Sequence, residues 1–100
     1  MKAYIVSFID VEDPELYKQY VARAPETIAA YGGSYVVRNG NKYALEGDLP
    51  DKRVVILEFP SVEKAREWHG SKEYSEVAKI RHKASKGTIF IIEGPEQPIV

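Results

Sequence analysis

The sequence predicts an α+β domain, because extended and helical patterns follow one another in the order β-α-β-β-α-β. Extended patterns rich in β-branched and aromatic residues mark strands at residues 2–9, 34–47, 53–59 and 87–94. Apolar residues at helical spacing mark two helical regions, residues 14–31 and 62–81. Elements in this order form an antiparallel four-stranded sheet with both helices on one face, the split βαβ or ferredoxin-like arrangement.

The first helix is predicted from the residues at its ends. Asp13 suits the N-cap, Pro14 suits the first helical position, and Gly32 stops the apolar stripe. Pro25 falls inside this helix and removes the hydrogen bond that its amide would donate to the carbonyl of Val21. We therefore expect a kink or a restart of the helix at Pro25.

The stretch SYVVRNGNKYALEG, residues 34–47, has two interpretations. Asn39-Gly40 is a strong hairpin signal, but its flanks are equally compatible with one long strand that contains a bulge. We favour the bulge, because GDLPDK at residues 47–52 offers a better chain reversal before the next strand. That next strand, residues 53–59, is apolar on both faces except at Glu58.

The second helical region is predicted to break in the middle. Ser61 caps its start, Gly70 ends its first part, and Ser71 can cap a second part. Trp68 lies on the inward stripe of the first part and Tyr74 on that of the second. Two short helices that meet at an angle pack less closely on a sheet than one straight helix, so we expect a cavity beside the joint.

The composition predicts a single domain, residues 1–100, without a nucleic-acid or membrane partner. The net charge of -1 gives no general attraction to nucleic acid or anionic lipid. No apolar run approaches the ~20 residues of a membrane span, and the first residues lack a signal-peptide cleavage site. The absence of cysteine excludes disulfides and thiolate metal sites and fits a reducing compartment, so the cytoplasm is the expected location.

Both faces of the predicted sheet are apolar, although the helices cover only one of them. In the first strand Tyr4, Val6 and Phe8 point one way, and Ala3, Ile5 and Ile9 point the other way. A monomer rarely exposes such a surface, so we expect a homodimer that packs sheet to sheet. The tail PEQPIV, residues 95–100, is expected to form an extended arm that can cross to the partner.

Several segments carry a family resemblance. They are YGGSYVVRNG at residues 31–40, LEGD at 45–48, VVILEFPSVEKAREWHGSKEY at 54–74, and the late Arg81. Together they resemble domain-of-unknown-function family 1330, which is similar to the dimeric α/β-barrel superfamily of cofactor-free monooxygenases, muconolactone isomerases and stress-responsive proteins. The resemblance implies a dimeric α/β barrel with a pocket between sheet and helices in each subunit, and it implies no particular activity. The chain departs from the family pattern at His69 and at Gly70-Ser71-Lys72, where a Ser-Pro pair is usual.

Arg38 and Glu58 are the most informative charges, because each interrupts a strand that otherwise looks buried. A buried unpaired charge costs several kcal/mol (order of magnitude), so both need partners. One interpretation is a salt bridge between them across adjacent strands. The other makes Arg38 a clamp for a carboxylate or enolate oxygen and Glu58 a base with a raised pKa. Glu46 fits either scheme.

Trp68 and Tyr74 are candidate ligand-binding residues, although aromatic residues at helical spacing are more often plain core. His69 is a candidate general base, but its neighbour Trp68 already occupies the inward stripe, which favours an exposed histidine. His69 and Glu73 have the spacing of two metal ligands, but the helix breaks between them and no third ligand is apparent. We therefore expect no metal site, and no cofactor-binding motif is present.

The sequence supports several functions. The first is a small dimeric barrel that binds a small anionic or carbonyl-bearing molecule near Arg38, Glu58, Trp68 and Tyr74, with or without cofactor-free proton-transfer or oxygenase chemistry. The alternatives are a non-catalytic dimer whose strand charges only stabilise the fold, and a ligand-sensing or stress-response module. A cavity of ~300 Å³ or more with unpaired polar atoms would favour binding. Full pairing of Arg38 with Glu58 would favour the structural alternative.

Overall fold

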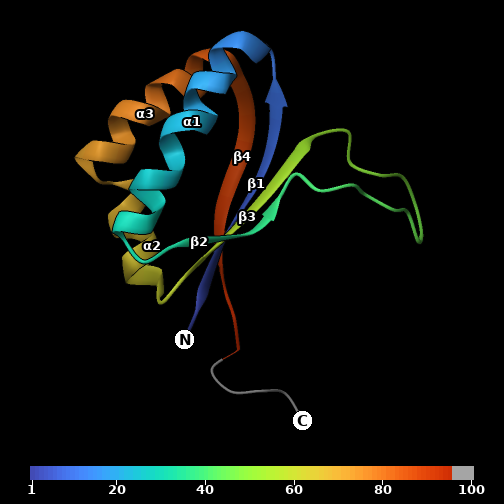
Figure 1. The fold of residues 1–100 in the computed structure, drawn as a ribbon. Coiled ribbons are helices and arrows are strands. Elements are labelled where there is room, and N and C mark those ends of the chain that lie inside the picture. The colour runs from blue at the N-terminus through green and yellow to red at the C-terminus, as the bar shows by residue number, and fades with distance from the viewer. Residues whose placement is uncertain (96–100) are drawn as a thin grey trace.

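The structure is a computed structural model that describes residues 1–95. Within this range the chain forms four strands and three helices, in the order β1 (Ala3–Val11), α1 (Pro14–Ala30), β2 (Ser34–Arg38), β3 (Arg53–Phe59), α2 (Val62–His69), α3 (Lys72–Ala84) and β4 (Ser85–Glu93). The helices lie together on one side of the sheet, and the other side is open (Figure 1). The predicted ferredoxin-like order is confirmed. The predicted C-terminal arm lies, apart from Pro95, outside the described residues.

The strands form one antiparallel sheet in the order β2-β3-β1-β4. The side chains of β1 alternate as the sequence predicts, since Ala3, Ile5 and Ile9 are buried against the helices, whereas Tyr4, Val6 and Phe8 are half-buried on the open face. Among the helices described for residues 1–95, none combines the length and the apolar character that are needed to cross a bilayer.

The helix starts follow the predicted caps. The side chain of Asp13 accepts a hydrogen bond from the amide of Leu16 at 3.1 Å, and Ser61 and Ser71 cap α2 and α3 in the same way. Helix α1 passes through Pro25 as one element, so the expected restart does not occur. The carbonyl of Val21, which Pro25 leaves without an amide donor, instead accepts from Arg38 Nη2 at 3.3 Å.

The predicted long second strand is wrong. β2 ends at Arg38, and its register shift lies between Tyr35 and Val37, not at Asn39-Gly40. Asn39 has φ 50°, a left-handed conformation that a strand does not accommodate, and its side chain and amide bond to Val54 at the start of β3. Residues 40–51 therefore form a loop that projects from the sheet on the side away from the helices (Figure 1).

The main core lies between the helices and strands β1 and β3. Its largest fully buried side chains are Trp68, Tyr74, Phe59 and Ile5. The ring of Trp68 lies 4.0 Å from that of Tyr74 and 5.5 Å from that of Phe59, measured between centroids. Trp68 Nε1 also donates to Thr27 Oγ1 at 3.0 Å. These contacts fix the end of α2 against α1 and α3.

Candidate functional site

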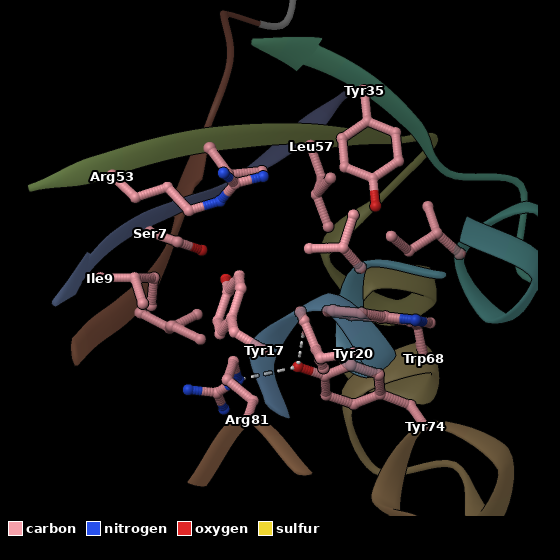
Figure 2. A pocket seen from close by; sticks show the side chains of 14 residues that line it. Ser7, Ile9, Tyr17, Tyr20, Tyr35, Arg53, Leu57, Trp68, Tyr74 and Arg81 are labelled. Carbon is pink, nitrogen blue, oxygen red and sulfur yellow. Dashed lines mark hydrogen bonds between the residues drawn. The ribbon is translucent and has the colours of Figure 1, made fainter. Parts of the chain in front are cut away.

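A cavity lies between the sheet and the helices, as the sequence predicts. Within residues 1–95 it is lined by 14 side chains from every strand and every helix (Figure 2). Its polar lining groups are Ser7, Tyr17, Tyr20, Tyr35, Arg53, Trp68, Tyr74 and Arg81. The free volume is only about 30 Å³, which is room for roughly two water molecules. The cavity is therefore much smaller than the ~300 Å³ expected for an open ligand pocket.

Arg81 is the most unusual residue of the cavity, because it is charged and only 7% exposed. It comes from the last turn of α3, where its Nε donates to Tyr74 Oη at 3.3 Å. Its Nη2 lies 3.1 Å from His82 Nε2, which must accept because a guanidinium only donates. Burial, with the adjacent charge of Arg81, lowers the pKa of His82, so a neutral ring is available at neutral pH.

The hydroxyls of Tyr20 and Tyr74 lie 2.9 Å apart, and both phenols line the cavity. Since Tyr74 Oη accepts from Arg81, the pair has two hydrogens and uses one of them in its mutual bond. The other hydrogen has no acceptor among the described residues. The cavity therefore offers one free phenolic donor next to a buried guanidinium, which suits an anionic oxygen.

Arg53 supplies a second guanidinium from the first position of β3. Its carbon Cζ lies 5.5 Å from the centroid of the Tyr17 ring, and its Nε is buried without a hydrogen-bond partner among the described residues. In Figure 2, Tyr17 lies between Arg53 and Arg81. The two arginines thus mark one side of the cavity as cationic, and Leu57 and Trp68 lie toward the other side (Figure 2).

No carboxylate offsets these two charges in the described part of the chain. The residues that line the cavity include no Asp or Glu, and the ion pairs found within residues 1–95 involve lysines, not arginines. Arg81 is buried whereas Arg53 is half-buried, and a guanidinium that is buried without an anion, as that of Arg81 is, is energetically unfavourable by several kcal/mol in order of magnitude. The cavity is therefore electrostatically suited to an anion.

Burial keeps three phenols of the cavity, those of Tyr17, Tyr20 and Tyr35, protonated at neutral pH by raising their pKa values. Burial raises the pKa of Tyr17, and the nearby charges of Arg53 and Arg81 offset this only in part. Burial and the neighbouring Tyr74 raise the pKa of Tyr20, and burial raises that of Tyr35. These groups therefore act as neutral hydrogen-bond donors, and the net charge of the cavity comes from the arginines.

Trp68 and Tyr74, two of the predicted site residues, do line the cavity. Arg38 does not, although it lies close to it, because its guanidinium rests 4.4 Å from the centroid of the Tyr35 ring and donates to Val21. Both of those neighbours belong to the cavity wall. Arg38 therefore supports the edge of the site from outside.

The predicted salt bridge between Arg38 and Glu58 is wrong. Arg38 pairs with Val55 across the strands, whereas Glu58 pairs with Ser34, so the two residues lie at different levels of the sheet. Glu58 also alternates with the buried Leu57 and Phe59, which puts its side chain on the open face. There it accepts from Tyr4 Oη at 3.2 Å and lies 3.6 Å from Lys2 Nζ. The structure thus separates Glu58 from the cavity by the thickness of the sheet.

Glu46 and His69 also lie outside the cavity. Glu46 is exposed in the projecting loop, and His69 is exposed at the end of α2, as its neighbour Trp68 led us to expect. His69 lines a separate shallow hollow of about 440 Å³ beside the joint of α2 and α3, together with Arg66, Gly70 and residues of β4. Within residues 1–95 no group of three or more His, Asp or Glu side chains has a metal-binding arrangement.

The site predicted from the sequence did not include Tyr17, Tyr20, Tyr35, Arg53 or Arg81. A signal existed for both arginines. Arg53 is in phase with the buried Leu57 and Phe59 of β3, and Arg81 follows Tyr74 and Val77 on the buried stripe of α3. A charge at a position that periodicity assigns to the core is a stronger indicator of a site than a charge that merely interrupts an apolar run.

Comparison with known families identifies the chain. The profile of the family described as "Domain of unknown function (DUF1330)" matches residues 2–95. The chain belongs to the DUF1330 family. Membership confirms the resemblance seen in the sequence, and it assigns no activity to this DUF1330 protein. A comparison with curated proteins found no significant match.

Solved structures share the fold of this DUF1330 protein at low sequence identity. RPA0582 of Rhodopseudomonas palustris, described as a protein of unknown function, is 20% identical with a TM-score of 0.74, covering 97% of this chain and 84% of that one. SnoaB of Streptomyces nogalater, described as a cofactor-independent oxygenase, is 15% identical with a TM-score of 0.69 over 96% and 95% of the chains. A Bacteroides fragilis protein, described as dimeric and ferredoxin-like, is 10% identical with a TM-score of 0.61 over 93% and 96%. At these identities the likeness establishes the fold alone.

Proposed function

We propose that this DUF1330 protein binds a small organic anion with an apolar body in the cavity between sheet and helices. One observation carries the proposal: Arg53 and Arg81 line the same cavity, and neither has a carboxylate partner among the described residues. The carboxylate or enolate of a ligand would lie at the arginine end, and its apolar part would contact Leu57 and Trp68.

Binding requires that the cavity opens, because its present free volume is about 30 Å³. Tyr35 and Arg53 are the residues best suited to move. Both are only half-buried, whereas Trp68 and Tyr74 are buried and hydrogen-bonded to α1. Arg81 is also buried, and it donates to Tyr74 of its own helix. We therefore expect ligand entry from the side of β2 and β3, with the helix side of the cavity unchanged.

The test is a thermal-shift and calorimetric screen of aromatic and branched aliphatic carboxylates, each paired with its neutral amide. We expect carboxylates to raise the melting temperature and the amides to have no effect. A ligand at about 100 times its Kd stabilises by about 2.7 kcal/mol, which corresponds to a shift of roughly 10–20 °C in a domain of this size. Arg81→Met and Arg53→Met should each weaken binding at least tenfold, since a charged hydrogen bond contributes about 1.5–3 kcal/mol.

The matched control is Arg23→Met, which removes an exposed arginine of α1 and should leave the affinity unchanged. Urea denaturation without ligand checks that each variant is folded. Equal stabilisation by carboxylates and amides would contradict the proposal. So would an Arg81→Met protein that is folded and binds as tightly as the wild type.

A second candidate function is cofactor-free catalysis on an enolisable or phenolic anion. It is favoured by the free phenolic hydrogen of the Tyr20 and Tyr74 pair beside Arg81, because such donors stabilise a developing oxyanion. The description of the structural neighbour SnoaB as a cofactor-independent oxygenase is compatible with this candidate. Among the described residues no carboxylate or imidazole lines the cavity to serve as a base, so we rank anion binding ahead of catalysis as the proposed function. Consumption of a bound ligand or of dissolved oxygen by the wild type, lost in Arg81→Met, would favour catalysis.

We also propose that two copies associate through the open face of the sheet. Large apolar side chains on this face stay half-buried or exposed in one subunit, among them Phe8, Phe90, with 43% of its surface exposed, and Ile92, with 53%. A second copy would cover them with the same surface. The dimeric, ferredoxin-like neighbour from Bacteroides fragilis supports this assembly by analogy. A cytoplasmic location remains part of the proposal.

A further inference from the structure

The loop at residues 40–51, here called the projecting loop, carries the two most exposed large apolar side chains of the described chain, Leu45 and Tyr43. Leu45 is 97% exposed, Tyr43 is 80% exposed and Leu49 is 47% exposed. Side chains of this size normally contribute to stability by burial, and in one subunit Leu45 and Tyr43 contribute almost none. Within residues 1–95 the chain provides no surface that covers Leu45 or Tyr43.

The projecting loop is attached only at its base. Asn39 bonds to Val54 through both its amide and its side chain, and Lys52 forms an ion pair with Asp10. Within residues 1–95, no hydrogen bond or ion pair involves residues 40–51. The base therefore fixes the direction in which the loop leaves the sheet, while its backbone groups and apolar side chains stay available.

The direction of the loop indicates what covers it. The helices lie on one side of the sheet, and the projecting loop extends to the other side, past the open face (Figure 1). A second copy on that face would lie alongside the loop. Because a twofold dimer uses each contact twice, two loops would each contact the opposite subunit.

We propose that the projecting loop clasps the second copy of this chain, with Tyr43 and Leu45 as its apolar contacts. This inference rests on the face-to-face dimer proposed above. It adds a second, separate contact region to that dimer, contributed by a loop and independent of the sheet surface. Other occupants, such as a different protein or the loop's own subunit, are alternative outcomes of the test.

The test measures dimer dissociation by sedimentation equilibrium for the wild type and for the double variant Tyr43→Ser, Leu45→Ser. We expect the dissociation constant to rise at least tenfold, because each dimer loses apolar burial at two equivalent places. The matched control, Lys42→Ser with Asp48→Ser, changes two polar residues of the same loop and should have no such effect. Circular dichroism checks the fold, which these side chains barely contact.

Hydrogen exchange gives an independent reading of the same contact. The amides of residues 40–51 should exchange more slowly at protein concentrations above the dissociation constant than below it. Two results would overturn the proposed loop contact and leave the face-to-face dimer intact. One is a double variant that dimerises with the same dissociation constant as the wild type. The other is a wild type whose loop amides exchange equally fast at both concentrations. A wild type that stays monomeric would overturn both proposals.

Discussion

Pro25 and Arg38 lie in different elements, and both determine the hydrogen bonding of the Val21 carbonyl. Pro25 leaves the carbonyl of Val21 without a helical donor, and Arg38 Nη2 donates to that carbonyl at 3.3 Å from the end of β2. The guanidinium is held over the Tyr35 ring at 4.4 Å. Arg38 thus has a structural role, and this supports in part the alternative in which strand charges stabilise the fold.

Replacing Arg38 by Met should lower the free energy of unfolding by about 0.5–1.5 kcal/mol, the usual contribution of such a bond and stacking contact. In a Pro25→Ala background the restored amide of residue 25 donates to the Val21 carbonyl. Replacing Arg38 by Met should then lower the free energy of unfolding by less. Urea denaturation of the four proteins of this double-mutant cycle measures the difference. An equal cost in both backgrounds would show that Arg38 does not serve the Val21 carbonyl.

Side-chain phase separates the charges that form the cavity from those that do not. Glu58 and Arg53 belong to the same strand, but their positions differ by an odd number of residues, so they point to opposite faces. On α3, Arg81 follows Tyr74 by two helical turns and so shares its buried side. Glu58 was predicted as a site residue because it is a charge within an apolar strand. The periodicity of buried positions instead indicates Arg53 and Arg81 as site residues.

The joint between α2 and α3 depends on Ser71. Its hydroxyl accepts from the amide of Tyr74 at 3.1 Å and donates to the carbonyl of Trp68 at 2.7 Å, and the residue is only 7% exposed. One side chain therefore ends α2 and starts α3, and it fixes the relative positions of the two aromatic residues of the cavity.

The variant Ser71→Ala should lose about 1–2 kcal/mol of stability, because a buried cap and a second hydrogen bond disappear together. Ser61→Ala is the matched control. It removes an N-cap of the same type at the solvent-accessible start of α2, where we expect the smaller loss of about 0.5–1 kcal/mol. Chemical denaturation compares the two variants. Equal losses would contradict a special role of Ser71 at the joint.

The second strand illustrates where local patterns fail. Residues 41–46 have a strand-like alternation, with Tyr43 and Leu45 two positions apart, but they do not extend β2, because Asn39 takes a left-handed conformation and turns the chain away from β3. β-strand propensity reflects packing against neighbouring strands, and no such neighbour is available to residues 41–46 within the described chain. The predicted long strand therefore followed from a local alternation of side chains and is wrong in three dimensions.

The sheet of the chain has one face covered by helices and one uncovered face, which is the proposed dimer interface. On the open face Phe8 and Phe90 stack at 6.5 Å between ring centroids. The variant Phe90→Asp should raise the dimer dissociation constant at least a hundredfold, because an unpaired carboxylate in an apolar interface costs several kcal/mol. Since 43% of Phe90 is exposed in one subunit, the fold should tolerate the change.

Sedimentation equilibrium tests this prediction. Gln19→Asp is the control, since it adds the same charge on the exposed surface of α1. If Phe90→Asp associates as tightly as the wild type, the open face is not the interface and the dimer must form elsewhere.

Local rules determined the order of elements, the caps at Asp13, Ser61 and Ser71, and the alternation of β1, since each depends on residues close together in the chain. They also placed Trp68 and Tyr74 in the cavity wall. The hydrogen-bond partners of Arg38 and Glu58, and the convergence of Arg53 and Arg81, depend on strand register and helix placement, which join residues 17 or more positions apart. Such contacts arise only when the sheet pairs and the helices pack on it, because no segment alone brings those side chains together.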